Sequence, residues 1–146
     1  MQDSHGRTID YIRISVTDQF NLRCVYCMPH ENTELSACQL TIEELELLCG
    51  CFSELGIQNV KITGGEPLMR KDVTEIICRI KNISGIKNVT LTTNGVLLAE
   101  RVCKLREAGL DAVNISMDSL NAAEYEEISQ RNMLGKTLEG MEAALA

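Results

Sequence analysis

The sequence of 146 residues contains no tryptophan and only two prolines, while 45% of its residues are hydrophobic. Nothing in this composition indicates a disordered or fibrous protein, since the hydrophobic fraction is normal for a globular chain. A chain of this length buries roughly 70% of the surface that it exposes when unfolded. The sequence therefore predicts a single domain over residues 1–146 with a true hydrophobic core.

The sequence also lacks a run of about 18 apolar residues, so no transmembrane helix is expected. Its first residues, MQDSHGRTIDY, contain no apolar segment of the kind found in a secretory signal, and a cytoplasmic location is expected. The formal net charge is −7. Because nucleic acids and anionic membranes are bound by basic surfaces, neither is expected as a partner.

The seven cysteines are an odd number and show no secreted disulfide pattern. In a reducing compartment, cysteines are more often buried, metal-binding or catalytic than cross-linked. Cys24 and Cys27 form a C-x-x-C motif just after an apolar, strand-like run. Four others lie in helix-like segments and are expected to be small buried apolar residues, namely Cys49, Cys51, Cys78 and Cys103.

Segments with strand and helix patterns alternate along the whole chain. Thr41 and Glu44 form the sequence pattern of a capping box at the start of the first helix. This order predicts an α/β fold in which parallel strands are joined by right-handed crossovers. The strands are expected at 11–17, 59–65, 88–95 and 111–120, and the helices at 41–56, 71–85, 97–109, after Asn121, and at 137–146.

A polar or glycine-rich motif follows each predicted strand: CVYC (24–27), GGEP (64–67), TTNG (92–95) and SMDS (116–119). Each motif is weak alone, because C-x-x-C also occurs in redox and zinc proteins, and the others are also found in turns and helix caps. In parallel α/β folds, however, the loops at the carboxyl ends of the strands converge on the active site. The four motifs together therefore predict one functional site at this edge.

The stretches YIRISVTDQFNLRCVYCMP, VKITGGEPLMRKD, LTTNGVLLAERVCKLREAGLDAVNISMDSL and TLEGMEAAL resemble the radical S-adenosylmethionine (SAM) superfamily, and within it the GTP 3′,8-cyclases of molybdenum cofactor biosynthesis. The resemblance covers nearly all of this chain but only the N-terminal half of the family's usual length. It implies a partial TIM-like barrel of four βα units. It also implies the first step of molybdopterin synthesis, in which a 5′-deoxyadenosyl radical abstracts a ribose hydrogen from GTP.

The resemblance assigns roles residue by residue. Cys24 and Cys27 would be thiolate ligands of a [4Fe–4S] cluster. Arg13, Lys61 and Thr92 would bind GTP, since cationic side chains suit a triphosphate. The positions that match contacts with S-adenosylmethionine are Tyr26, Gly64, Gly65, Glu66 and Ser116, with Glu66 placed to receive the ammonium group of the cofactor.

Two departures from the family pattern put activity in question. Phe20 stands where the pattern C-x-x-x-C-x-x-C has its first cysteine, and phenylalanine cannot bind iron. Cys38, in the loop before the first helix, is a candidate substitute, although the favoured interpretation of Cys38 is an ordinary loop cysteine without a role in the site. Second, the family barrel has six βα units, and the sequence predicts four. Two alternatives therefore remain open: a degenerate, non-catalytic module of the same fold, and a zinc or redox module built on C-x-x-C.

The incomplete barrel also leads to an expectation about assembly. A fourth strand without a neighbour and an uncovered apolar sheet face would favour a homo-oligomer or a partner that covers the open edge. The alternative is that the last predicted helix, 137–146, folds over the open side.

Overall fold

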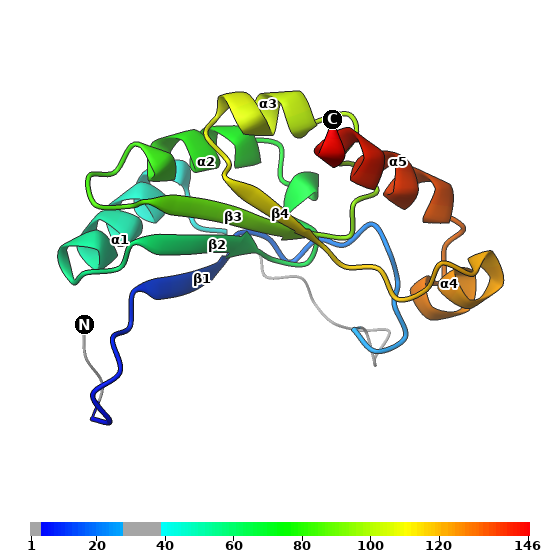
Figure 1. The fold of residues 1–146 in the computed structure, drawn as a ribbon, viewed down its shortest axis with the longest axis horizontal. Helices are drawn as coiled ribbons and strands as arrows, with labels where there is room; N and C mark the ends of the chain where they lie inside the picture. Colours follow the sequence, from blue (N-terminus) through cyan, green and yellow to red (C-terminus); the bar gives the residue numbers. More distant parts are fainter. Residues whose placement is uncertain (1–3, 28–38) are drawn as a thin grey trace.

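The computed structural model describes residues 4–27 and 39–146, and in this part of the chain it confirms the predicted α/β architecture. Four parallel strands form one sheet in the order β1-β2-β3-β4 (Figure 1). Arg13 of β1 is paired in register with Lys61 of β2, which is paired in turn with Thr90 of β3. The strands are β1 (Tyr11–Ser15), β2 (Asn59–Thr63), β3 (Asn88–Thr93) and β4 (Ala112–Ile115).

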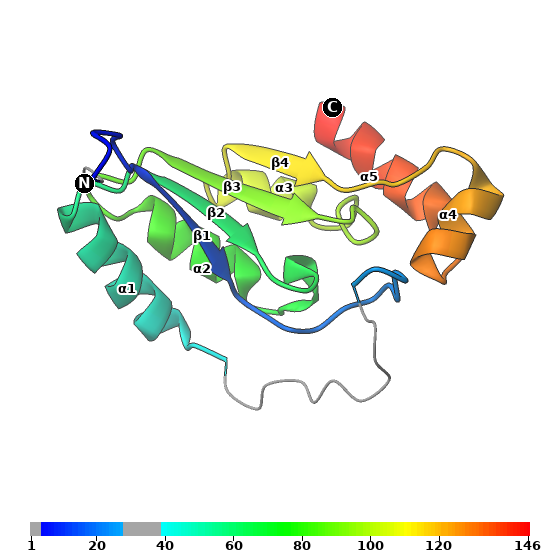
Figure 2. The ribbon, with the colours of Figure 1, turned by 90° about the horizontal axis from the view of Figure 1, so that it is seen from below.

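Three helices, α1, α2 and α3, cover one face of the sheet, whereas α4 and α5 lie toward the carboxyl ends of the strands (Figure 1). Figure 2 shows the opposite face, which no helix of the described residues covers. This is the layout of an opened barrel, with the helices outside. The helical elements are α1 (Ile42–Glu54), the short 3-10 helix η1 (Pro67–Met69), α2 (Val73–Lys81), α3 (Val102–Glu107), α4 (Ala122–Ser129) and α5 (Leu134–Leu145).

The helix starts test the sequence patterns directly. The predicted capping box is present, because the Glu44 amide donates to Thr41 Oγ1 (3.2 Å) and the Thr41 amide donates to Glu44 Oε2 (2.8 Å). The helix predicted at 97–109 begins only at Val102, since the preceding residues form turns in which the Leu98 amide bonds to the Gly95 carbonyl (3.0 Å). The last helix begins earlier than predicted, at Leu134 rather than at residue 137.

The two faces of the sheet differ sharply in polarity. Ile14, Ile62 and Leu91 point into the core beneath the helices, as the two-residue period of a strand dictates. The alternate residues of the strands lie on the bare face, and they are mostly polar, so the expectation of an uncovered apolar face is wrong. The bare-face residues are Tyr11, Arg13, Ser15, Asn59, Lys61, Thr63, Asn88, Thr90, Thr92, Ala112, Asn114 and Ser116.

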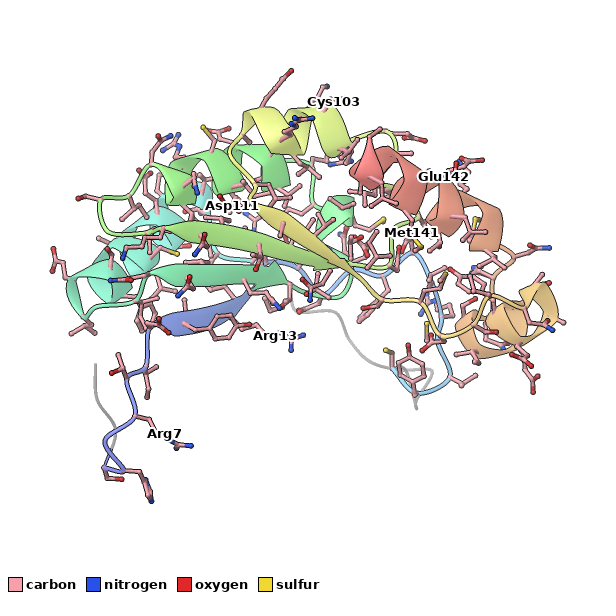
Figure 3. The ribbon with its side chains drawn as sticks, viewed as in Figure 1. Arg7, Arg13, Cys103, Asp111, Met141 and Glu142 are labelled. Carbon is pink, nitrogen blue, oxygen red and sulfur yellow. The ribbon has the colours of Figure 1, made fainter. Side chains whose placement is uncertain are left out.

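The prediction that all four helix cysteines are buried is wrong for three of them. Only Cys49 is buried, and burial raises the pKa of its thiol to about 11. Cys51, Cys78 and Cys103 are exposed, and Cys103 points away from the sheet on α3 (Figure 3). The reason is geometric: α1, α2 and α3 form a single outer layer, so only their sheet-facing sides are covered. In the described ranges, no helix combines the length and apolar character needed to cross a bilayer.

Candidate functional site

The predicted site residues gather in one pocket at the carboxyl edge of the sheet. The pocket has a volume of about 280 Å³ and receives side chains from the loops after all four strands and from α4. Convergence of the four motifs is thus confirmed by their positions in the fold. The predicted residues that line the pocket are Arg13, Cys24, Tyr26, Cys27, Gly64, Gly65, Glu66, Thr92 and Ser116.

Lys61 is the one predicted site residue of the described chain that does not line this pocket. It lies beside Arg13 on the bare face of the sheet, with its ammonium nitrogen 6.0 Å from the centre of the Tyr11 ring. Arg13 reaches toward the pocket, where its Nε donates to Thr63 Oγ1 (3.4 Å), and Figure 3 shows its side chain on the uncovered side. The two cations are therefore neighbours on the bare face of the sheet, with Arg13 at the pocket and Lys61 outside it.

The C-x-x-C turn is held in place by α4. The Arg23 amide donates to the Ser129 carbonyl (3.0 Å), and the Val25 amide donates to the Ile128 carbonyl (3.0 Å). Within the turn, the Cys27 amide donates to the Cys24 carbonyl (3.0 Å). These bonds satisfy free carbonyls at the end of the helix and position both thiols at the pocket.

The hydroxyl of Tyr26 donates a hydrogen bond to Asp118 Oδ2 across the mouth of the pocket (2.9 Å). Partial burial, together with this bond to Asp118, raises the pKa of Tyr26 above its ordinary value, although most of the side chain is exposed. Burial also raises the pKa of the Cys24 thiol. The attacking thiol of a dithiol redox centre usually has a lowered pKa, and Cys24 shows no such lowering.

The two glycines after β2 are required by close packing of the chain on itself. A Cβ atom at Gly64 would lie 2.5 Å from the Thr17 carbonyl oxygen, and one at Gly65 would overlap the Gln19 carbonyl oxygen. This closeness lets the Gly65 amide bond to Thr17 (2.7 Å) and the Glu66 amide bond to Gln19 (2.6 Å). The glycine pair thus packs the loop after β1 onto the end of β2.

Glu66 is 1% exposed, and its carboxylate joins two of the motifs. Oε1 accepts hydrogen bonds from the Leu68 amide (2.9 Å) and from Thr93 Oγ1 (2.7 Å), and Oε2 accepts one from the Asn94 amide (2.8 Å). Burial raises the pKa of Glu66, although these three donors act in the opposite direction. In the structure its observed role is therefore to hold the GGEP and TTNG loops together; the ammonium contact remains a prediction.

Sequence reasoning missed the contribution of α4 to the pocket. Tyr125 and Ser129 line it, and the Tyr125 hydroxyl lies 3.0 Å from Thr137 Oγ1 of α5. Thr137 in turn donates to the Asn94 carbonyl (3.2 Å), which attaches α5 to the TTNG loop. In the sequence these residues resemble ordinary buried positions of amphipathic helices, so no local pattern distinguishes them.

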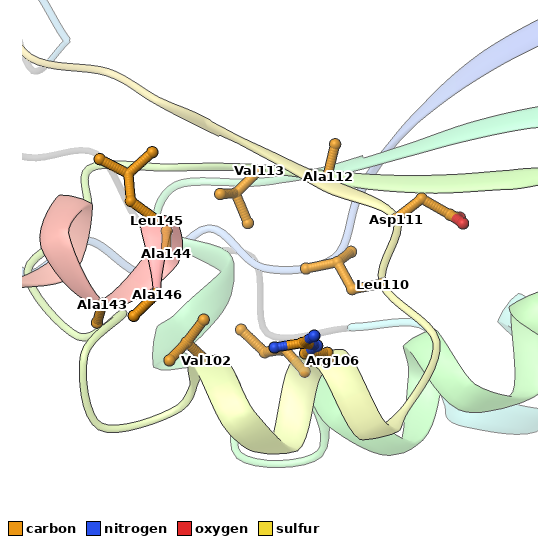
Figure 4. Close-up of a pocket in the computed structure, with 11 residues that line it drawn as sticks. Val102, Arg106, Leu110, Asp111, Ala112, Val113, Ala143, Ala144, Leu145 and Ala146 are labelled. Atoms are coloured by element: carbon orange, nitrogen blue, oxygen red, sulfur yellow. The ribbon is translucent and has the colours of Figure 1, made fainter.

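A second cavity, of about 390 Å³, lies between α3, β4 and α5 (Figure 4). Aliphatic side chains such as Val102, Val113 and Leu145 form much of its wall, with Arg106 and Asp111 also lining it. None of the predicted site residues in the described ranges lines this cavity.

The described residues do not complete a [4Fe–4S] site. Two thiols are at the pocket, and no group of three or more His, Cys, Asp or Glu side chains in the described ranges could hold a metal. Phe20 also lines the pocket, with its ring Cδ2 2.9 Å from where a Cβ on Gly65 would lie. A cluster with one open iron needs three thiolates, so the described donor set is one ligand short. Cys38 lies outside the described residues.

The sequence comparison places the chain in a family. The model of the Radical SAM superfamily matches residues 14–146. A GTP 3′,8-cyclase of Limosilactobacillus fermentum is 45% identical over the whole chain, which covers 45% of that protein. Molybdenum cofactor biosynthesis protein 1 of Mus musculus is 44% identical over 99% of the chain, which covers 23% of it. The chain thus spans about half the length of the bacterial relative and a smaller part of the mouse protein.

Solved structures agree on the fold. Methylornithine synthase superposes with a TM-score of 0.74 at 18% identity, covering 92% of this chain and 41% of the enzyme. Native anSMEcpe with bound AdoMet superposes with a TM-score of 0.73 at 20% identity, again over 92% of this chain and 40% of that protein. The chain belongs to the radical SAM superfamily. Within it, the most informative similarity is to the GTP 3′,8-cyclases.

Proposed function

We propose that this chain forms the S-adenosylmethionine pocket and part of the GTP-binding surface of a GTP 3′,8-cyclase-like protein of molybdenum cofactor biosynthesis. The observation that carries the proposal is the convergence of four motifs on one pocket of about 280 Å³. The names of its relatives at 44–45% identity support it. Because the chain spans about half of the bacterial relative, the activity of a whole cyclase is itself part of the proposal.

In this proposal the pocket residues bind and orient. Tyr26 and Ser116 contact S-adenosylmethionine, while Gly64 and Gly65 leave space for it next to the backbone and Glu66 faces its ammonium group. Arg13 and Lys61 bind the triphosphate of GTP from the bare face, with Thr92 beside them. Because that face is polar, it is better suited to contact a polar substrate than to be buried against another apolar layer.

The metal site is tested by adding the missing thiol. Phe20→Cys would place a third sulfur at the pocket, so it is expected to raise bound iron and sulfide after anaerobic reconstitution. Phe20→Ser is the matched control, because it removes the ring without adding a thiolate. Equal and full iron content in the wild type and both variants would show that another group already completes the site. Cys38 would be the first candidate, and Cys38→Ser would then be expected to abolish iron binding.

The nucleotide surface is tested by charge removal. Arg13→Gln with Lys61→Gln is expected to weaken GTP binding, measured by calorimetry at low salt, and the wild-type affinity should fall as salt is added. Lys87→Gln together with Lys136→Gln removes the same charge elsewhere and should leave binding unchanged. GTP binding that is insensitive to the Arg13 and Lys61 pair would refute the assigned surface.

The second candidate is a degenerate, non-catalytic module, which the phenylalanine at position 20 favours. Metal analysis separates the candidates: a [4Fe–4S] spectrum supports the enzyme, bound zinc supports a zinc module on Cys24 and Cys27, and neither metal supports the degenerate module. An oligomer, or a partner at the open edge, remains a prediction. Sedimentation at about 100 μM tests it, and a compact monomer would contradict it.

A further inference from the structure

The C-x-x-C turn, residues 24–27, is attached to the rest of the fold at two places. Its beginning is fixed by backbone bonds to the carboxyl end of α4, at Ile128 and Ser129. Its far side is tied by the Tyr26 hydroxyl to Asp118, a residue 92 positions away in the loop after β4. Both attachments lead to α4, since Asp118 precedes this helix by only a few residues and Ser129 ends it.

The attachment at Tyr26 depends on its hydrogen bond to Asp118. Tyr26 is 61% exposed, so burial of its ring does little to fix its position. The acceptor, by contrast, lies on a well-braced loop. The Asn121 amide donates to Ser119 Oγ (3.0 Å), Ser119 Oγ donates to Glu124 (2.7 Å), and Asn121 caps α4. A carboxylate on a rigid support is a strong acceptor for a phenol.

We propose that Asp118 is a positioning residue, which holds the turn of residues 24–27 against the pocket by accepting the hydrogen bond of Tyr26. The effect on ligand binding rests on the proposed function: a ligand in the pocket contacts the turn, so loss of the Tyr26–Asp118 hydrogen bond lowers the affinity for S-adenosylmethionine-like ligands. Asp118 itself lines the same pocket, so the bond sits at the boundary of the ligand space.

Hydrogen exchange measures the position of the turn without any ligand. Asp118→Ala and Tyr26→Phe should each accelerate exchange of the Val25 and Cys27 amides by about five- to tenfold, the effect of losing one hydrogen bond that closes a local unit. Asp118→Asn keeps an acceptor oxygen and should stay within about twofold of the wild type. The Gly65 amide, which bonds elsewhere, reports that the remaining fold is unchanged.

The same variants are then compared for binding of S-adenosylhomocysteine by calorimetry. Asp118→Ala should weaken binding about fivefold, and adding Tyr26→Phe should cause no further loss, because both remove the same bond. Glu126→Ala removes an exposed carboxylate from α4 and serves as the control. Unchanged exchange in Asp118→Ala, or additive losses in the double variant, would overturn the proposal. If the wild type does not bind S-adenosylhomocysteine, the proposed function fails, and the exchange data still decide whether Asp118 positions the turn.

Discussion

Replacing Glu66 with glutamine tests how the buried carboxylate holds two loops of the site together. Glutamine has nearly the same shape, but only one of its two terminal atoms accepts hydrogen bonds. The carbonyl can still accept from Leu68 and Thr93, and the amide nitrogen then faces the Asn94 amide, so two donors meet. Leaving one buried donor without an acceptor costs about 1–3 kcal/mol of unfolding free energy.

The pH dependence reveals whether burial or hydrogen bonding dominates at this position. Burial raises the pKa of Glu66 in the folded state, so the wild type is favoured while the carboxyl is protonated. The contribution of Glu66 to the free energy of unfolding is fully present below the ordinary glutamate pKa. It decreases as the pH rises through the raised pKa of the folded state. The penalty of Glu66→Gln is therefore expected to be larger at pH 4 than at pH 7.

The assay is urea unfolding of the wild type and the variant at both pH values. The effects of the other carboxyl groups cancel in the difference between the two unfolding free energies at each pH. Glu107→Gln, at an exposed position of α3, is the control and should stay within about 0.5 kcal/mol of the wild type. A penalty that is larger at pH 7 would refute the reasoning, since it would mean that the three donors outweigh burial. No penalty at either pH would show that Glu66 does not join the loops.

The remaining predictions concern packing around the site, and urea unfolding measures each of them. Gly65→Ala forces a Cβ against the Gln19 carbonyl and should cost more than about 2 kcal/mol, whereas Gly50→Ala, in α1 with open space around it, should stabilise by about 0.5–1 kcal/mol. Comparable effects at the two glycines would contradict the packing argument. Arg70 is buried and donates to the Val16 and Leu40 carbonyls (both 2.8 Å) and to Asp72, so Arg70→Lys, which cannot span these acceptors, should cost about 2 kcal/mol. The hydrogen bond from Arg70 lowers the pKa of Asp72 in the folded state, so the wild type should lose this contribution as the pH falls from the ordinary aspartate pKa through the lowered one, and Arg70→Ala should not. An unchanged acid dependence in Arg70→Ala would count against the pair.

The sequence alone determined the order of strands and helices and the edge at which the chemistry gathers. Both follow from local physics: side-chain periodicity, helix caps such as Thr41 with Glu44, and the rule that parallel strands end at one rim. For the same reason the pocket residues Cys24 and Ser116 could be predicted without coordinates.

Only the tertiary structure decided what each residue contacts. Glu66 is occupied by donors from the next loop, Lys61 lies on the sheet face outside the pocket, and the bare face is polar where an apolar one was expected. Asp118 is joined to Tyr26 across 92 residues. Contacts of this kind depend on how distant segments pack, and no short-range pattern in the sequence encodes which donor meets which acceptor. The physical reason is that periodicity fixes the face on which a side chain lies, while its partner is fixed only when the loops have converged.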